Sequence, residues 1–146
     1  MKRLVTSFRL LTSTFAMSLA MAPAWAQSAP APALSLELNA AQPSEKGCRL
    51  TFVVNNALGT DLSKAAFEIA LFNAAGVVDR LTVLDFKDLP AGKTKVTRFD
   101  LAGADCGKLS RVLINSATEC AGNGVEPATC MRGLKTSTRT GIAFGV

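Results

Sequence analysis

Residues 48–55 read CRLTFVVN, and apolar side chains recur at every second position through most of this stretch. Leu50, Phe52 and Val54 would share one face, and Arg49, Thr51 and Asn55 would share the other. This alternation is typical of a strand with one buried face and one exposed face. Residues 34–39, LSLELN, repeat the pattern, and the turn-forming stretch PSEKG at 43–47 lies between the two predicted strands.

The rest of the chain continues as short segments separated by turn residues. We expect further strands at 66–72, 77–86, 93–101, 109–115 and 133–138, with the tail 142–144 packed back onto the body. Residues 66–72 also contain good helix formers, so a helix is the alternative there. A β-bulge within 77–86 would let Val77, Leu81 and Val83 reach the core together with Leu84 and Phe86. The pattern predicts an all-β, Ig-like antiparallel sandwich of about seven strands.

The N-terminus has the features of a secretory signal peptide. A basic start precedes an apolar stretch at 10–22, and Ala24-Trp25-Ala26 places small residues around a cleavage site. The apolar stretch is shorter than the ~20 residues that span a bilayer, so a retained anchor is the less favoured alternative. We expect residues 1–26 to be cleaved after Ala26, residues 27–33 to form a Pro/Ala tether, and residues 34–146 to form the domain. The expected location is the periplasm or the outside of the cell.

Four cysteines follow the predicted cleavage site: Cys48, Cys106, Cys120 and Cys130. An even number in an oxidising compartment predicts two disulfides, with three possible pairings. If successive strands alternate in direction, Cys48 and Cys106 begin strands that run the same way, and both lie at one end of the sandwich. This favours Cys48–Cys106 with Cys120–Cys130. The spacings suit neither a zinc ribbon nor a thioredoxin-type motif, so a metal or redox site is the lesser alternative.

Composition narrows the possible chemistry. The sequence has no His, which is the usual residue for proton transfer near neutral pH, so Ser-His-Asp and Cys-His sites are excluded. We expect no enzyme activity, no cofactor and no metal site. Four aspartates near turns lack the spacing of a calcium-binding loop: Asp85, Asp88, Asp100 and Asp105. Removing residues 1–26 lowers the net charge from +5 to +2, because three of the 16 Lys and Arg residues and none of the 11 acids lie there. That balance does not indicate nucleic-acid binding.

Two groups of basic residues could contact an anionic surface such as lipid headgroups. They are Lys93, Lys95 and Arg98 near the fifth predicted strand, and Arg132, Lys135 and Arg139 near the seventh. In an Ig-like order these strands belong to opposite sheets, so we expect the two groups to face apart. We favour the alternative of ordinary solvated strand faces, and we expect no stable membrane insertion after the signal is removed.

Two resemblances add to this interpretation. Ile69-Ala70-Leu71-Phe72-Asn73, followed by LPAGKT at 89–94, resembles the FxLYD-type Ig-like domains of bacterial exported proteins. The stretches LSLELNAAQPSEKGCRLTFVVNN, FEIALFNAAGVVDRL, LPAGKTKVTRFDL and CGKLSRVLINSATEC resemble a group of small alphaproteobacterial exported proteins of unknown function, often labelled "Tat pathway signal sequence domain protein". The twin arginine of that label is not matched here. The resemblance implies export, a sandwich and disulfides, and it adds no catalytic residue.

The sequence therefore predicts a non-catalytic, exported binding or accessory module of the cell envelope. We expect its partner to be another envelope protein. The alternative is a structural subunit of a surface assembly, joined to its neighbours by strand addition.

Overall fold

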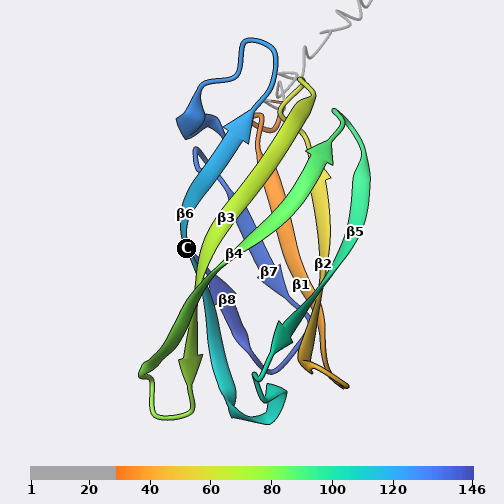
Figure 1. Cartoon of the computed structure of the whole chain (residues 1–146). Helices are drawn as coiled ribbons and strands as arrows, with labels where there is room; N and C mark the ends of the chain where they lie inside the picture. The colour runs from red at the N-terminus through yellow and green to blue at the C-terminus, as the bar shows by residue number, and fades with distance from the viewer. Residues whose placement is uncertain (1–28) are drawn as a thin grey trace, which may run out of the picture.

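The computed structural model describes residues 29–146, which fold into an all-β sandwich of eight strands (Figure 1). The strands are β1 (Leu34–Ser44), β2 (Gly47–Asn56), β3 (Leu62–Asn73), β4 (Val78–Leu89), β5 (Thr94–Ala102), β6 (Leu109–Ala121), β7 (Lys135–Thr138) and β8 (Ala143–Gly145). Two 3₁₀ turns, η1 (Cys106–Lys108) and η2 (Pro127–Cys130), flank β6. The predicted sandwich is confirmed, and the helical alternative for 66–72 is wrong because β3 covers that stretch. No helix within 29–146 is long and apolar enough to cross a membrane.

The predicted signal peptide, residues 1–26, lies outside the described residues. The predicted tether lies within them only from Ala29 onward. Its last residue, Ala33, is buried, and its carbonyl accepts a hydrogen bond of 3.0 Å from the Ala57 N–H. The packed domain thus begins one residue before the predicted boundary.

The eight strands form two sheets of four. The first has the order β5-β2-β1-β7 and the second the order β4-β3-β6-β8. Figure 1 shows β4, β3 and β6 in front of β1, β2 and β5. Every neighbouring pair is antiparallel except β1–β7 and β6–β8, which are parallel. β2 lies between β1 and β5, and β3 lies beside β6, as in an Ig-like sandwich.

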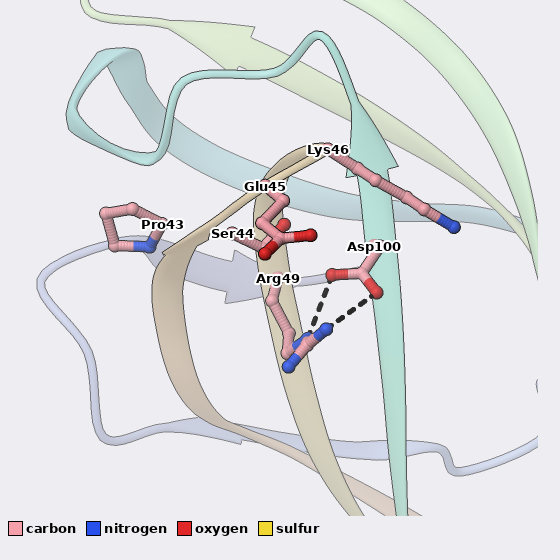
Figure 2. Close-up of a pocket in the computed structure, with 6 residues that line it drawn as sticks. All are labelled: Pro43, Ser44, Glu45, Lys46, Arg49 and Asp100. Atoms are coloured by element: carbon pink, nitrogen blue, oxygen red, sulfur yellow. Dashed lines mark hydrogen bonds and ion pairs between the residues drawn. The ribbon is translucent and has the colours of Figure 1, made fainter.

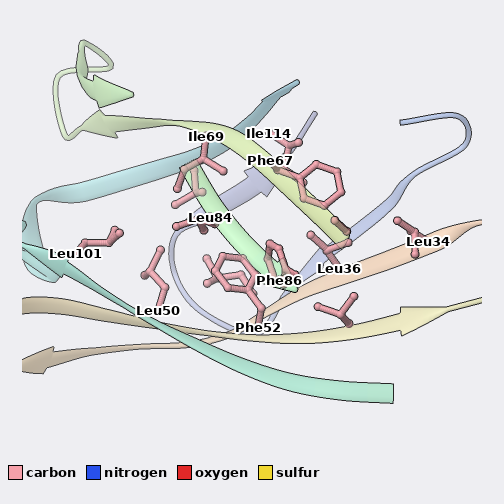
Figure 3. Close-up of a cluster of buried hydrophobic side chains, with 14 of the residues drawn as sticks. Leu34, Leu36, Leu50, Phe52, Phe67, Ile69, Leu84, Phe86, Leu101 and Ile114 are labelled. Atoms are coloured by element: carbon pink, nitrogen blue, oxygen red, sulfur yellow. The ribbon is translucent and has the colours of Figure 1, made fainter. Parts of the chain in front are cut away.

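The core fills the space between the sheets with the alternating apolar residues that the sequence predicted (Figure 3). Phe52 from one sheet and Phe67 from the other both pack against Phe86 on β4, with ring centroids 5.6 and 5.8 Å apart. Both contacts are edge-to-face, a geometry that adds about 0.5–1.5 kcal/mol per pair beyond area burial. These three fully buried rings tie β2, β3 and β4 together across the sandwich.

One buried polar side chain joins the end of β2 to the end of β4. Asn56 is almost completely buried. Its amide donates to the carbonyl oxygens of Leu89 at 2.7 Å and Thr60 at 2.9 Å, and its side-chain oxygen accepts from the Leu58 N–H at 3.0 Å. Because buried polar groups cost free energy unless they are paired, this set of bonds fixes the loop after β2.

Side-chain hydrogen bonds connect the edge strands β4 and β5 at both ends, and the other two edge strands are short. Lys95 on β5 donates to the carbonyl oxygens of Asp88 at 2.8 Å and Phe86 at 3.2 Å on β4. At the other end, Arg80 on β4 donates to the Ala102 carbonyl of β5 at 2.8 Å. The remaining edges, β7 and β8, have four and three residues. Bridged edges and short edges both discourage pairing with another chain.

Candidate functional site

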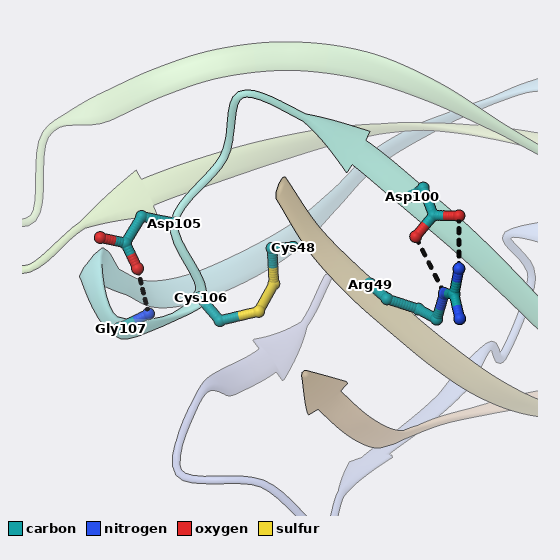
Figure 4. Close-up of a disulfide and its surroundings, with 6 residues drawn as sticks. All are labelled: Cys48, Arg49, Asp100, Asp105, Cys106 and Gly107. Carbon is teal, nitrogen blue, oxygen red and sulfur yellow. Dashed lines mark hydrogen bonds and ion pairs between the residues drawn. A yellow bond between two sulfur atoms is a disulfide. The ribbon is translucent and has the colours of Figure 1, made fainter. Parts of the chain in front are cut away.

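The two disulfides have the predicted pairing. Cys48, near the start of β2, bonds to Cys106 at the start of η1, with the two Cα atoms 5.0 Å apart (Figure 4). Cys120 on β6 bonds to Cys130 on η2, with the Cα atoms 5.8 Å apart. The first bond ties β2 to the turn before β6 in the opposite sheet, and the second closes the loop after β6. Both disulfides cross-link separate secondary-structure elements, and no free cysteine remains among the described residues.

The turn between β1 and β2 lies beside the first disulfide. Gly47 has a φ of 147°, and a Cβ atom there would overlap the Leu101 carbonyl oxygen. The Lys46 carbonyl also accepts a 2.9 Å hydrogen bond from the Gly103 N–H. The β1–β2 turn therefore packs its backbone directly against the end of β5, and only glycine fits.

The same turn borders a hollow of about 650 Å³, shown in Figure 2. On its wall, Arg49 Nε and Nη2 each lie 2.9 Å from an oxygen of Asp100. This paired contact lowers the pKa of the Asp100 carboxyl and raises the pKa of Arg49. Glu45 and Lys46 add one charge of each sign. The charges of the hollow balance one another, so its net charge favours neither an anion nor a cation.

The basic residues predicted from the sequence do not form one cationic surface. β5 and β7 lie at opposite edges of the same sheet, three strand positions or about 14 Å apart. The prediction that they belong to opposite sheets is wrong, because the chain crosses after the Cys120–Cys130 loop and pairs β7 in parallel with β1. Three of the six cations form ion pairs: Lys95 with Asp88 at 3.2 Å, Arg132 with Glu126 at 3.1 Å and Arg139 with Glu37 at 2.9 Å.

The predicted acidic residues are also dispersed. Asp85 pairs with Lys87 at 2.6 Å, and Asp105 accepts a 2.9 Å hydrogen bond from the Gly107 N–H at the start of η1. These contacts account for the carboxylates as turn and ion-pair partners. In the part of the chain that the structure describes, no three potential metal ligands come together.

The unusual surface of this sandwich is an apolar face on the outside of the β4-β3-β6-β8 sheet. On β4, Val78, Leu81 and Val83 are 49%, 56% and 52% exposed, and Val77 just before the strand is 58% exposed. Leu84 and Phe86, which alternate with Leu81 and Val83, are buried in the core. Val78 has the parity of Leu84 but points outward, because the register with β3 shifts between Arg80 and Val78. The prediction that a bulge would bring both sets to the core is wrong, because Val77, Leu81 and Val83 stay exposed.

The register extends this apolar surface across the sheet. Leu81 lies opposite Ala70 on β3, which lies opposite Leu113 on β6. One step along the strands, Val78 lies opposite Phe72, and Phe72 lies opposite Arg111. In the other direction, Val83 lies opposite Glu68. We use the term apolar face for Phe72, Val78, Leu81, Val83 and Leu113.

Two charged side chains border the apolar face at opposite ends. The Arg111 guanidinium lies 5.5 Å from the centre of the Phe72 ring. Glu68 accepts a hydrogen bond from the Asn115 amide. Neither Arg111 nor Glu68 forms an ion pair with another described residue, whereas Lys64 on β3 and Glu119 on β6, farther along the same sheet, pair at 2.8 Å.

Alternation along β4 does contain the signal for this surface. Two parities of apolar residue occur in one strand, and only one parity can face the core of a sandwich. The second set of apolar residues therefore predicts an apolar contact outside the core. The bulge hypothesis missed this contact because it assigned both sets to the core.

Comparisons of the chain with protein-family models, with curated proteins and with solved structures find no match.

Proposed function

We propose that this chain is a non-catalytic binding module of the bacterial cell envelope, exported by its N-terminal signal, which docks another exported protein chain on its apolar face. The observation that carries the proposal is the row of large apolar side chains on β4 that stay about half exposed. Contiguous exposed apolar surface on a folded domain marks an interaction site more often than scattered single residues do.

The energetics of the face suit protein docking. Full burial of a valine or leucine side chain contributes about 1.5–3 kcal/mol, so a half-exposed one has about 1 kcal/mol left to gain from a partner. The free energy still available from burying the four exposed side chains is about 4 kcal/mol in total. They are Val77, Val78, Leu81 and Val83. A micromolar complex needs about 8 kcal/mol after the entropy of association is subtracted, so these four side chains supply the apolar centre of a weak complex and do not reach micromolar affinity by themselves.

Export is supported by the two disulfides, which persist in oxidising compartments. We propose that the mature chain begins at Gln27 in the periplasm or the medium. Intact-mass measurement of the protein recovered from the periplasmic fraction tests this. A recovered species that still contains Trp25 would contradict cleavage after Ala26.

Strand addition, the alternative role, is less well supported by the edges of the sandwich. Lys95 and Arg80 bridge the β4 and β5 edges through main-chain carbonyls, and the other two edge strands are very short. A face can dock a partner without breaking these bridges. Binding through the face of the sheet is therefore the function that the geometry favours over extension of the sheet.

Site-specific photo-crosslinking tests the proposal. The full chain is expressed in its envelope with a photoreactive phenylalanine analogue at Leu81, and separately at Val96. Val96 is the matched control because it is 59% exposed on the outer face of the other sheet. We expect a discrete protein adduct at position 81 and none at position 96. Equal labelling at both positions, or adducts at neither, would contradict docking through the apolar face.

A further inference from the structure

The apolar face can pair with the same face of another copy of the chain. Resting on the proposed function, we propose that the protein that docks there is a second copy of this chain. The two copies pack with their β4-β3-β6-β8 sheets face to face. The two-fold axis lies between the sheets and runs perpendicular to the strands, along the row formed by Leu81, Ala70 and Leu113. Such an isologous interface places the same patch on both sides, which is the commonest symmetry of soluble oligomers.

A two-fold axis in this position reverses the strand direction of the second copy. Residues on one side of the axis row in one copy therefore face residues on the other side of that row in the second copy. Leu81 and Leu113 lie on the axis row and meet their own symmetry mates. Val78 of one copy faces Val83 of the other. Facing apolar rows of two sheets interdigitate with the sheets about 10 Å apart, as inside a sandwich.

The same operation brings the two unpaired charges together. Arg111 lies in the Phe72 row, and Glu68 lies four residues earlier on the neighbouring strand β3. Within one copy the two rows are about 13 Å apart along the strands. Across the axis β3 faces β3, so Glu68 of the second copy lies opposite Phe72. Arg111 lies one strand to the side, and its guanidinium, 5.5 Å from the centre of the Phe72 ring, lies on the side of β3 that this Glu68 approaches. The dimer therefore gives two ion pairs to charges that lack one among the described residues.

The area that the axis lets overlap fits a weak, reversible dimer. Ala70 lies three residues before the end of β3, so the two copies overlap over about three residues on each side of the axis row. Seven rows of three strands cover about 23 Å by about 14 Å, or about 300 Å² per copy. Two copies then bury about 600–700 Å², which is the size of a small interface of the weak, transient kind.

A charge-swap mixing experiment tests the arrangement. The probes are the disulfide-intact mature protein and its variants Arg111→Glu and Glu68→Arg. Their association is measured by sedimentation from about 1 µM to about 1 mM, because a small interface predicts a weak dimer. We expect wild-type protein to dimerise reversibly. Each single variant alone opposes two pairs of like charges, so its dimer should dissociate about tenfold more readily. An equimolar mixture of the two variants restores both ion pairs and should recover the dimer.

Matched controls exclude general effects of charge and of folding. Arg98→Glu makes the same charge change on the outer face of the other sheet and should leave the dimer unchanged. Leu81→Lys should abolish the dimer, whereas Val96→Lys should not. Far-UV circular dichroism of each variant confirms that the sandwich is intact before its mass is measured.

The outcomes separate this inference from the proposed function. Wild-type protein that stays monomeric over the whole range overturns the second-copy inference. If position 81 then still crosslinks to a different protein, the binding module stands with another partner. A dimer that neither charge variant weakens, or that their mixture fails to restore, places the interface elsewhere and also overturns the inference. A monomer with no adduct at position 81 overturns both.

Discussion

Two leucines on one strand provide a matched test of how the sandwich is built. Leu84 and Leu81 lie three residues apart on β4, yet Leu84 is 3% exposed and Leu81 is 56% exposed. Leu84→Ala removes a fully buried side chain and leaves a cavity between the sheets, so it should lower the free energy of unfolding by about 2–5 kcal/mol. Leu81→Ala removes a half-exposed side chain and leaves no cavity, so its effect on the monomer should be about 1 kcal/mol or less.

Denaturant unfolding with intact disulfides measures both changes. Far-UV circular dichroism is the suitable probe, because the sequence has no Tyr and its one Trp precedes the predicted cleavage site. The measurement is made at the lowest practical protein concentration, where the monomer dominates. Equal losses for Leu84→Ala and Leu81→Ala would refute the inward and outward assignment on β4. A larger loss for Leu81→Ala would show that the strand is turned over and that the apolar face is part of the core.

Further measurements test other parts of the structure. The double variant Cys48→Ala/Cys106→Ala opens a loop of 58 residues and should lower the free energy of unfolding by about 4 kcal/mol, against about 3 for the short-loop disulfide, with both read from denaturant midpoints. Asn56→Ala leaves the Leu58 N–H and two carbonyls without their partner and should cost about 2–3 kcal/mol, whereas an effect below 1 would contradict its buried role. The contact with Arg49 lowers the folded-state pKa of Asp100 below its ordinary value of 3.8. The contribution of this carboxylate to the free energy of unfolding is therefore fully present above that value, and it is lost as the pH falls through the lower folded-state pKa. Melting temperatures should therefore fall in acid less steeply for Asp100→Asn than for the parent protein.

The cysteine pairing could be predicted because it depends only on strand direction. Alternating strands place the starts of β2 and β6 at one end of the sandwich, and Cys48 and Cys106 lie at or next to those starts. Direction alone does not determine which sheet a strand joins. The position of β7 depends on where the chain goes after the Cys120–Cys130 loop, and it pairs in parallel with β1 rather than joining the sheet opposite β5. A parallel edge pair leaves no signature in the local sequence pattern.

Which of the two sets of apolar residues on β4 faces outward could not be predicted, for a different reason. Alternation with a period of two residues shows which residues of a strand share a face. It does not show whether an apolar face contacts the core or another surface. Leu81 and Leu84 look equally suited to the core in the sequence. Only the pairing of β4 with β3, which aligns Leu81 with Ala70 and Leu84 with the buried Phe67, decides which one faces inward. Candidate docking surfaces of this kind become visible when a strand contains more apolar residues than one face can hold.

The proposed dimer also constrains how the N-terminus can be attached. β1 begins at Leu34, at the end of the sandwich where Ala31 and Pro32 border a hollow together with Thr129 and Arg132 of the Cys120–Cys130 region. A two-fold axis across the strands points the two copies of this end in opposite directions. Two copies held by N-terminal anchors in one membrane could pair only with their strands along the membrane plane, because an upright dimer carries one of the two ends about 40 Å away from the membrane. The proposed cleavage after Ala26 would release the dimer from that orientation. Retention of residues 1–26 should therefore restrict the orientation of the dimer without preventing it, so the charge-swap pair should recover association with and without these residues.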